Sequence, residues 1–157
     1  MLHEWLQRPH VAEWWMPTPP SLDEVIEDFT PLTEQGARDR AYIALEGDCA
    51  IGYIQSYTVK DAGDGWWEDE TDPGARGIDQ FLADADHLGR GLGTAMVRAF
   101  VTRLFEDPAV TKIQTDPNPR NARAIRCYEK AGFRAVREVD TPDGRALQMI
   151  RNREGVA

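Results

Sequence analysis

The stretch that decides the fold is Leu88-Gly89-Arg90-Gly91-Leu92-Gly93-Thr94. It separates a largely apolar segment, Arg76–Ala83, from Thr94–Phe105, where apolar residues recur at helical spacing. Glycines in such a turn let the backbone approach a phosphate, which the free N–H groups of the first helical turn then bind. No Gly-Lys-Ser/Thr follows, so the turn is not a P-loop, and Thr94 replaces the third glycine of a dinucleotide fingerprint. Alone, the turn predicts either a phosphate cradle or a tight strand-to-helix connection.

A second informative stretch lies downstream, Asn121-Ala-Arg-Ala-Ile-Arg-Cys-Tyr-Glu-Lys-Ala-Gly-Phe133. We expect a helix here, opened by Asn118-Pro119 and closed by Gly132, because proline favours the first helical turn and glycine the C′ position. Together the two stretches resemble the GNAT superfamily of acetyltransferases, which pairs an R/Q-x-x-G-x-G turn with an N-x-x-A-x-x-x-Y-x-K-x-G-F helix. Leu88 departs from this pattern by standing at the Arg/Gln position. The contacts to pyrophosphate come mostly from backbone N–H groups, so the departure weakens the resemblance little.

The resemblance implies an α/β (α+β) fold, a central mixed and mostly antiparallel sheet flanked by helices. A splayed parallel pair of strands in that sheet holds acetyl-CoA. We expect a single acetyltransferase domain over residues 1–157. The family's first edge strand precedes the helix that carries Glu4-Trp5-Leu6, and we expect it to be absent because Met1 already lies in this helix. A monomer is expected, although an uncovered sheet edge would favour a dimer.

The remaining elements follow from local patterns. Residues 1–8 are predicted to be helical, and Ser21 with Glu24 predicts a capping box at the start of a second helix. Strands are expected in five further segments, of which the first two and the last two form hairpins, at Ala41–Leu45, Ala50–Val59, Lys112–Asp116, Phe133–Val139 and Ala146–Ile150.

The composition restricts the possible partners. The net charge of −9 argues against nucleic acid and anionic membranes. Two explanations of this negative charge remain open. It attracts a cationic ligand to an acidic cleft, or it only keeps the protein soluble. No apolar run reaches the ~20 residues of a membrane span and no signal peptide is visible. Cys49 and Cys127 form no disulfide framework, so we expect a cytoplasmic protein.

Four further segments narrow the resemblance. They are Asp64-Gly-Trp-Trp-Glu68, Thr71-Asp-Pro-Gly74, Arg76-Gly-Ile-Asp-Gln80 and Lys112-Ile-Gln-Thr-Asp-Pro117. They look like the aminoglycoside 6′-N-acetyltransferases of the Ib and II types. This implies direct attack of the antibiotic's 6′-amine on acetyl-CoA in a ternary complex, which confers resistance. The alternatives are an acetyltransferase of another small cationic amine and a non-catalytic module that binds acyl-CoA or aminoglycosides.

Two aspartates are candidates for the reacting centre. Asp79 lies inside a strand otherwise suited to burial, so it is either a compensated buried acid or a residue on a solvated face. The resemblance favours a general base that anchors the reacting ammonium. Asp116 ends the next strand, and it either binds a second amine, shares the base role, or caps the following helix.

Acetyl transfer also needs an acid and a cofactor site. Tyr128 is predicted to protonate the departing thiolate, since the pKa of a phenol is comparable to that of a thiol. A packed aromatic residue is the alternative. Backbone N–H groups of the strand that carries Asp79 are expected to polarise the carbonyl. Asn121 either bonds the pantetheine arm or satisfies its own helical turn. The cofactor-binding residues are expected to be Phe81, Leu82, Ala83, Leu88, Gly89, Arg90, Gly91, Leu92, Gly93, Thr94 and Asn121.

The loop that precedes the Asp79 strand is acidic and aromatic. Asp64 and Trp67 are predicted to contact the ammonium groups and sugar rings of the substrate, although the loop is alternatively only solvated. By resemblance, Trp15 and Gln55 also line the substrate site. No metal is expected. The loop lacks the glycine that an EF-hand requires, and the scattered His3, His10 and His87 are expected to be surface residues.

Overall fold

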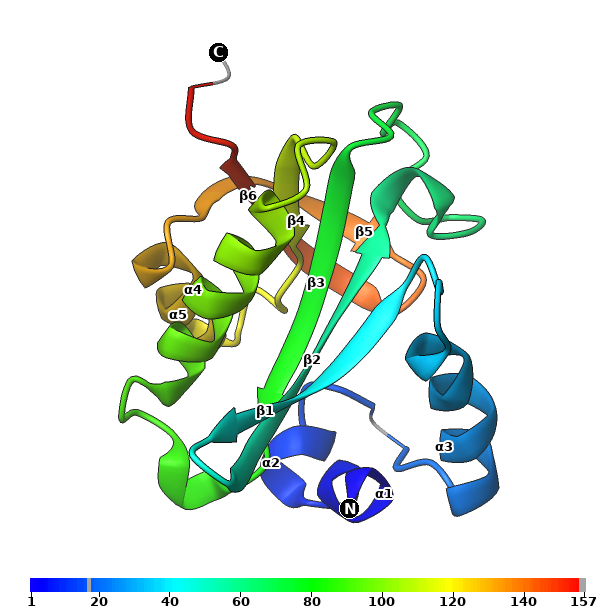
Figure 1. Cartoon of the computed structure of the whole chain (residues 1–157), viewed down its shortest axis with the longest axis vertical. Helices are drawn as coiled ribbons and strands as arrows, with labels where there is room; N and C mark the ends of the chain where they lie inside the picture. Colours follow the sequence, from blue (N-terminus) through cyan, green and yellow to red (C-terminus); the bar gives the residue numbers. More distant parts are fainter. Residues whose placement is uncertain (17, 156–157) are drawn as a thin grey trace.

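The sheet has the predicted mixed topology (Figure 1). The computed structural model describes residues 1–16 and 18–155. Six strands in this part of the chain run in the order β1-β2-β3-β4-β6-β5. Their bounds are β1 Arg40–Glu46, β2 Cys49–Thr58, β3 Ala75–Leu82, β4 Lys112–Thr115, β5 Arg134–Thr141 and β6 Gly144–Asn152. Every neighbouring pair is antiparallel except β3–β4, so the expected mixed, mostly antiparallel sheet is confirmed.

The parallel pair β3–β4 is short. Its register joins Ala75 to Lys112, Arg76 to Ile113 and Gly77 to Gln114, and pairing ends there. β3 nevertheless continues to Leu82, and β4 ends at Thr115. Beyond Gly77 the two strands therefore separate and leave backbone groups of β3 unpaired on the side that faces β4.

Helices cover both faces of the sheet. In Figure 1, α4 (Leu92–Phe105) and α5 (Ala122–Lys130) lie together on one side, and the N-terminal helices lie on the other. The N-terminal helices are α1 Leu2–Leu6, α2 Pro9–Ala12 and α3 Leu22–Phe29. Short 3-10 turns add η1 Thr30–Thr33, η2 Val59–Asp61 and η3 Ala85–His87. None of the helices in the described residues has the length and apolarity needed to cross a membrane.

Each face of the sheet has its own core. The larger core lies under α4 and α5 and includes Ile78, Val97 and Ile113, all fully buried. The second lies under the N-terminal helices, where Trp5 and Leu6 of α1 pack in one cluster with Tyr53 of β2. The sheet is thus packed against helices on both faces, around the place where β3 and β4 separate.

Two helix boundaries differ from the prediction. The helix expected over residues 1–8 is present as α1 but ends at Leu6, and a second short helix that was not predicted, α2, begins at Pro9, since proline favours the first helical position. The helix expected from Asn118-Pro119 starts only at Ala122, with Asn121 as its N-cap. At α3 the predicted capping box of Ser21 and Glu24 is confirmed.

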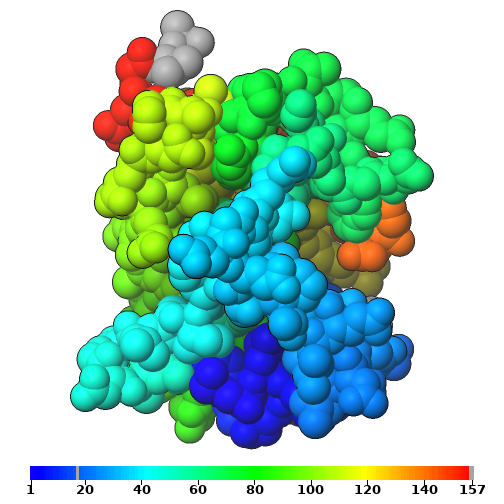
Figure 2. Space-filling view, turned by 45° about the vertical axis from the view of Figure 1, so that its right-hand side comes forward, coloured from blue at the N-terminus to red at the C-terminus, as the bar shows by residue number. Residues whose placement is uncertain are grey.

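The loop between β2 and β3 folds back against the sheet. Trp67 is buried there together with Val59 and Ala75. Figure 2 shows this loop, in teal and green, beside the turn between β5 and β6, in orange. Consistent with this, a Cβ added at Gly65 would lie 3.2 Å from Cγ of Pro142 in that turn. The loop therefore meets the β5–β6 turn on the side of the sheet that carries the N-terminal helices.

Candidate active site

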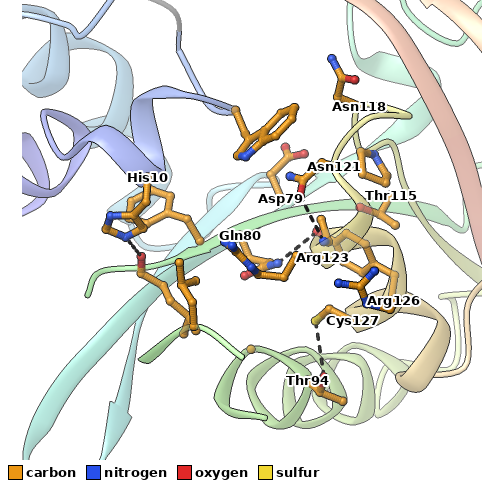
Figure 3. A pocket seen from close by; sticks show the side chains of 18 of the residues that line it. His10, Asp79, Gln80, Thr94, Thr115, Asn118, Asn121, Arg123, Arg126 and Cys127 are labelled. Atoms are coloured by element: carbon orange, nitrogen blue, oxygen red, sulfur yellow. Dashed lines mark hydrogen bonds between the residues drawn. The ribbon is translucent and has the colours of Figure 1, made fainter. Parts of the chain in front are cut away.

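A cavity of about 470 Å³ opens where β3 and β4 separate. Its wall comes from α2 and the residues after it, from β3, from the glycine turn before α4, from the segment after β4, and from α5. In Figure 3, His10 lies on one side of the opening and Thr94, Arg126 and Cys127 lie on the other. The cavity thus joins the predicted cofactor turn to the predicted acidic residues.

The glycine turn presents a helix N-terminus to this cavity. Gly89 and Gly91 have φ values of 73° and 84°, which a residue with a side chain adopts only with strain. Gly91 is the N-cap of α4, and no side chain caps the helix. The first-turn N–H groups are therefore available to an anion and are aided by the helix dipole. This arrangement fits the phosphate groups of acetyl-CoA.

Cationic side chains on α5 line the same cavity. Arg123 and Arg126 are exposed there, and Lys130 lies one turn further along. Sequence reasoning missed these residues, although their presence on a helix that follows a phosphate turn was a usable signal. They supply positive charge beside the glycine turn in a chain whose net charge is −9. A polyanionic cofactor is thus accommodated on this side of an otherwise acidic protein.

Asp79 and Asp116 both line the same cavity. Burial raises the pKa of Asp79, and the negative charge of Asp143 raises it further. Burial also raises the pKa of Asp116 well above its usual value, with Asp79 and Asp143 adding to the rise. Asp143, in the β5–β6 turn, is a third carboxylate that the sequence prediction did not assign to the site. Such a group of acids suits a ligand that carries several ammonium groups.

A hydrogen-bond relay holds Asp79. The Tyr53 hydroxyl donates to Gln55 Oε1 at 2.5 Å, and Gln55 Nε2 donates to Asp79 Oδ2 at 3.0 Å. The second bond lowers the pKa of Asp79 against the effect of burial. Gln55 was predicted to line the substrate site, but it is not among the residues that line the cavity. In the structure it contacts Asp79 instead.

Tyr128 combines a packed ring with a hydroxyl at the cavity. Its ring packs against Phe133 with 5.5 Å between ring centroids, and its side chain is buried. Gln80 Nε2 donates to the hydroxyl at 3.4 Å, and Thr115 also hydrogen-bonds it. Burial raises the pKa of Tyr128, so the phenol keeps its proton at neutral pH and remains able to donate it.

The backbone of β3 offers alternate groups to the opening. The Ala83 N–H donates to Ile51 O, so the backbone groups of Ala83 point toward the β2 side. Successive residues of a strand alternate in direction, so the N–H and C=O of Leu82 point toward β4. His10, predicted to be a surface residue, instead hydrogen-bonds Leu82 O through Nε2 at 2.9 Å (Figure 3). Its bond occupies the carbonyl of Leu82, so the N–H is the group that Leu82 can offer to a ligand. Ala83 was predicted to bind the cofactor, but its N–H is occupied and it does not line the cavity.

The cavity brings together most of the residues predicted for the site. Those that line it are Trp15, Asp79, Phe81, Leu82, Leu88, Gly89, Gly91, Gly93, Thr94, Asp116, Asn121 and Tyr128. Those that do not are Gln55, Asp64, Trp67, Ala83, Arg90 and Leu92. Asp64 is exposed on its loop, whereas Trp67 is 7% exposed and packs against Val59 and Ala75. Trp67 therefore stabilises the loop and presents little surface to a substrate.

The N-cap of α5 bears on two alternatives that the sequence leaves open. Asn121 Oδ1 accepts from the Ala124 N–H at 3.2 Å, so Asn121 does satisfy its own helical turn. Only its Nδ2 group is left to donate to a cofactor. Asp116 does not cap the helix, because Asn121 holds that position. Asp116 therefore lines the cavity and plays no part in capping α5.

Known proteins share this architecture and sequence. Residues 1–141 match the acetyltransferase (GNAT) domain family. The aminoglycoside N(6′)-acetyltransferase type 1 of Klebsiella pneumoniae is 55% identical over 98% of this chain and 78% of its own length. A kanamycin resistance protein of Rhizobium radiobacter is 66% identical over 57% of this chain and 82% of its own length. A crystal structure of aminoglycoside acetyltransferase AAC(6′)-Ib with coenzyme A and kanamycin matches with a TM-score of 0.92 and 56% identity, covering 98% of this chain and 88% of that one.

Proposed function

Because the chain belongs to the GNAT acetyltransferases, and within them to the aminoglycoside 6′-N-acetyltransferases, we propose that it acetylates the 6′-amino group of aminoglycosides and thereby confers resistance. The observation that carries this proposal is a single cavity lined by groups of opposite charge. The N-terminus of α4, which no side chain caps, lines it together with Arg123 and Arg126, and so do Asp79 and Asp116. A polyanionic cofactor and a polycationic substrate thus meet at the gap between β3 and β4.

Bound acetyl-CoA supplies an activated acetyl group as a thioester. The residues that would hold its phosphates are the turn Leu88–Thr94, with Arg123 and Arg126 beside it. The Leu82 N–H faces the gap between β3 and β4. It would donate a hydrogen bond to the thioester carbonyl of acetyl-CoA and polarise it. It is one of the β3 backbone N–H groups expected from the sequence to polarise the carbonyl.

Asp79 is the proposed general base. Burial raises its pKa, which makes its carboxylate a stronger base, while the hydrogen bond from Gln55 keeps it oriented. We assign Asp116, which lines the same cavity, the role of binding a substrate ammonium; burial and the charge of Asp79 raise its pKa, and a bound cation would favour its ionised form again. The charge of Asp79 raises the pKa of Asp116, so we expect the protonation of the two acids to be coupled.

Tyr128 is the proposed general acid. Its hydroxyl lies at the cavity with its proton retained, and it would donate that proton to the departing thiolate. Cys127 lines the same cavity and accepts from Thr94 Oγ1 at 3.6 Å. Burial raises the pKa of the Cys127 thiol, which keeps it protonated and a poor nucleophile. Direct attack without a covalent enzyme intermediate is the mechanism that these groups support.

We further propose that residues 1–157 form one acetyltransferase domain that acts as a monomer in the cytoplasm. The glycine turn, Asp79, Asp116 and Tyr128 already meet within one copy of the chain, which supports the monomer, and the uncovered sheet edge leaves a dimer as the alternative. The two cysteines are free, as expected in a reducing compartment. Light scattering of the purified protein with and without kanamycin would test the monomer, and a dimer that loses activity on dilution would contradict it.

The function is tested by thiol release from acetyl-CoA in the presence of kanamycin. We expect saturable release that depends on both substrates, and one acetyl group on the product. The panel should include spermidine and a lysine peptide at the same concentrations. A higher kcat/KM for either of these would favour an acetyltransferase of another amine. Tight binding of kanamycin and acetyl-CoA without thiol release would favour a binding module.

A further inference from the structure

Side chains from the N-terminal helices hold the C-terminal end of β3. His10, the second residue of α2, hydrogen-bonds Leu82 O through Nε2 at 2.9 Å, and Arg8 Nη1 donates to Ala83 O at 2.5 Å. Arg8 is in turn oriented by an ion pair with Glu4 at 2.6 Å. Successive carbonyls of a strand point to opposite edges, so the two side chains hold β3 from both edges. His10 and Leu82 line the cavity, whereas Arg8 does not.

The side chains at this end of β3 are fixed as well. The ring of Phe81 stacks on Tyr53 with 5.4 Å between centroids and meets Trp15 edge-on at 5.0 Å, in the core under the N-terminal helices. The side chain of Leu82 lies on the other face of the sheet, in the core under α4 and α5. The peptide between Phe81 and Leu82 is therefore held by packing on both faces. Its N–H is the group proposed to polarise the thioester.

The carbonyl of Leu82 points to the same edge of β3 as this N–H. Pairing of that edge with β4 ends at Gly77, so the carbonyl faces the gap and not a neighbouring strand. Without His10 it would need a water molecule or a turned peptide to satisfy it, because a buried carbonyl rarely stays unpaired. Either change would disturb the place where the thioester carbonyl must lie. The contact of His10 thus bears on the reacting centre as well as on the attachment of α2.

The partner of His10 also limits what this residue can do. A carbonyl only accepts, so Nε2 carries the proton and donates it to Leu82 O (Figure 3). Both the neutral imidazole with its proton on Nε2 and the imidazolium can make this bond. Because the Nε2 proton is engaged with the backbone, the contact assigns His10 a role in orientation and not in proton transfer.

We propose that His10 is a positioning residue that holds the Leu82 carbonyl and thereby aims the Leu82 N–H at the thioester carbonyl of acetyl-CoA. This inference rests on the proposed function and adds to the same site a residue that acts through the backbone of β3. The N–H is most useful when negative charge develops on the thioester oxygen, so the effect of His10 belongs in kcat. Coenzyme A lacks this carbonyl and is therefore the reference ligand.

The test compares two amide side chains at position 10. In His10→Gln the amide nitrogen can take the place of Nε2, whereas in His10→Asn it reaches only the place of Nδ1 and falls short of Leu82 O. We expect His10→Asn to lower kcat with kanamycin by about 10- to 100-fold, the scale of a displaced or lost donor. The Kd for coenzyme A should stay nearly unchanged. His10→Gln should keep most of the wild-type kcat, because it restores the donor.

The matched control is His3→Asn, on α1 and outside the cavity, which should leave kcat unchanged. Wild-type kcat in His10→Asn would overturn the inference. An equal loss in His10→Asn and His10→Gln would also overturn it, because the loss would then not follow the hydrogen bond. A loss confined to Tm or to the affinity for coenzyme A would reduce His10 to an attachment of α2. If His10→Asn does not fold, His10→Leu, which has no donor, takes its place with the same expected results.

The sequence allows both peptides to be observed by NMR without turnover. Phe81-Leu82 is the one Phe-Leu pair in the sequence, and Leu82-Ala83 is the one Leu-Ala pair. Carbon-13 in the first carbonyl and nitrogen-15 in the second amide therefore give a single cross-peak for each peptide. In the free protein, the Leu82 carbonyl resonance should move upfield in His10→Asn, which loses the hydrogen bond, and stay in place in His10→Gln.

The response to ligands completes the test. Acetyl-CoA should move the Leu82 amide proton downfield in the wild type, coenzyme A should not, and His10→Asn should reduce the shift. If the wild type releases no thiol with kanamycin, the proposed function fails, and the Leu82 amide still decides whether His10 positions it toward the thioester. Equal resonances in the wild type and His10→Asn, with and without acetyl-CoA, would refute the role of His10.

Discussion

Gln55 Nε2 donates to Asp79 Oδ2 at 3.0 Å across the β2–β3 pair. The Tyr53 hydroxyl donates to the other end of the Gln55 amide, so the orientation of this amide is fixed. The ring of Tyr53 is in turn stacked on Phe81 with 5.4 Å between centroids. The aromatic core under the N-terminal helices thereby sets the position of the proposed base.

Gln55→Met is expected to weaken acetyl transfer in acid. The Gln55 hydrogen bond lowers the pKa of Asp79, so its loss raises that pKa and moves the acidic limb of kcat/KM to higher pH. At pH values above the limb the rate should approach that of the wild type. The measurement is a pH profile with kanamycin, and Gln7→Met, remote from Asp79, is the control. An unshifted limb would show that Gln55 does not influence the base.

Asp79→Asn should lower kcat/KM by roughly 10²–10⁴, the scale of general acid–base catalysis. Asp116→Asn should mainly raise KM for the aminoglycoside, because this residue is proposed to bind an ammonium group. Steady-state kinetics of both variants separates the two roles. If instead Asp116→Asn abolishes kcat and Asp79→Asn does not, the assignment of the base must be exchanged.

Tyr128→Phe should slow acetyl transfer while leaving the affinity for coenzyme A nearly intact. The ring would keep its packing against Phe133, and only the hydroxyl that Gln80 and Thr115 hydrogen-bond would be lost. Single-turnover kinetics and calorimetric titration with coenzyme A measure the two quantities. Weakened affinity with an unchanged rate would make Tyr128 a packing residue.

Arg123→Ala with Arg126→Ala should weaken coenzyme A binding by about two- to tenfold, as expected for two exposed ion pairs. The loss should shrink as salt is raised, because exposed charges are screened. Calorimetry at two salt concentrations tests this. Arg38→Ala, which removes an exposed arginine paired with Asp61, is the control. Equal affinities for the double variant and the control would remove the arginines from the cofactor site.

The capping box of α3 provides a prediction of stability alone. Ser21 Oγ accepts from the Glu24 N–H, and Glu24 Oε2 accepts from the Ser21 N–H at 2.7 Å. Ser21→Ala should cost about 1 kcal/mol and lower Tm by about 2–4 °C, with kcat/KM unchanged. Thermal unfolding followed by circular dichroism measures this. A loss of activity without a loss of Tm would link α3 to the site in a way that the structure does not show.

The parts of the site that the sequence predicted share a local signal. The glycine turn is visible because positive φ requires glycine, and Asp79 is visible because a charge interrupts an apolar strand. Trp67 was assigned to the substrate because its loop is acidic and aromatic, yet the loop uses it to pack on Val59. Only the folded register shows that Gln55 faces Asp79. Such pairings depend on contacts between strands, which no single segment contains.

The N-terminus of α5 shows how two helix-start signals can compete. Asn118-Pro119 carries a helix-start signal, but Asn121 also caps well, and the helix begins after it. The choice matters for function, because it uses Asn121 Oδ1 for the cap and leaves Asp116 free to face the cavity. The observed strand order is the same whichever residue caps the helix, because it is set by the hairpins and the parallel pair.

The most direct test of the central claim compares two aminoglycosides that differ only at the 6′ carbon, such as neomycin, with an amine there, and paromomycin, with a hydroxyl. Thiol release from acetyl-CoA is measured with each, and the product is located by NMR. The proposed function predicts rapid release with neomycin, a single acetyl group on its 6′ nitrogen, and little or no release with paromomycin. Equal rates with the two, or an acetyl group on another nitrogen, would contradict it.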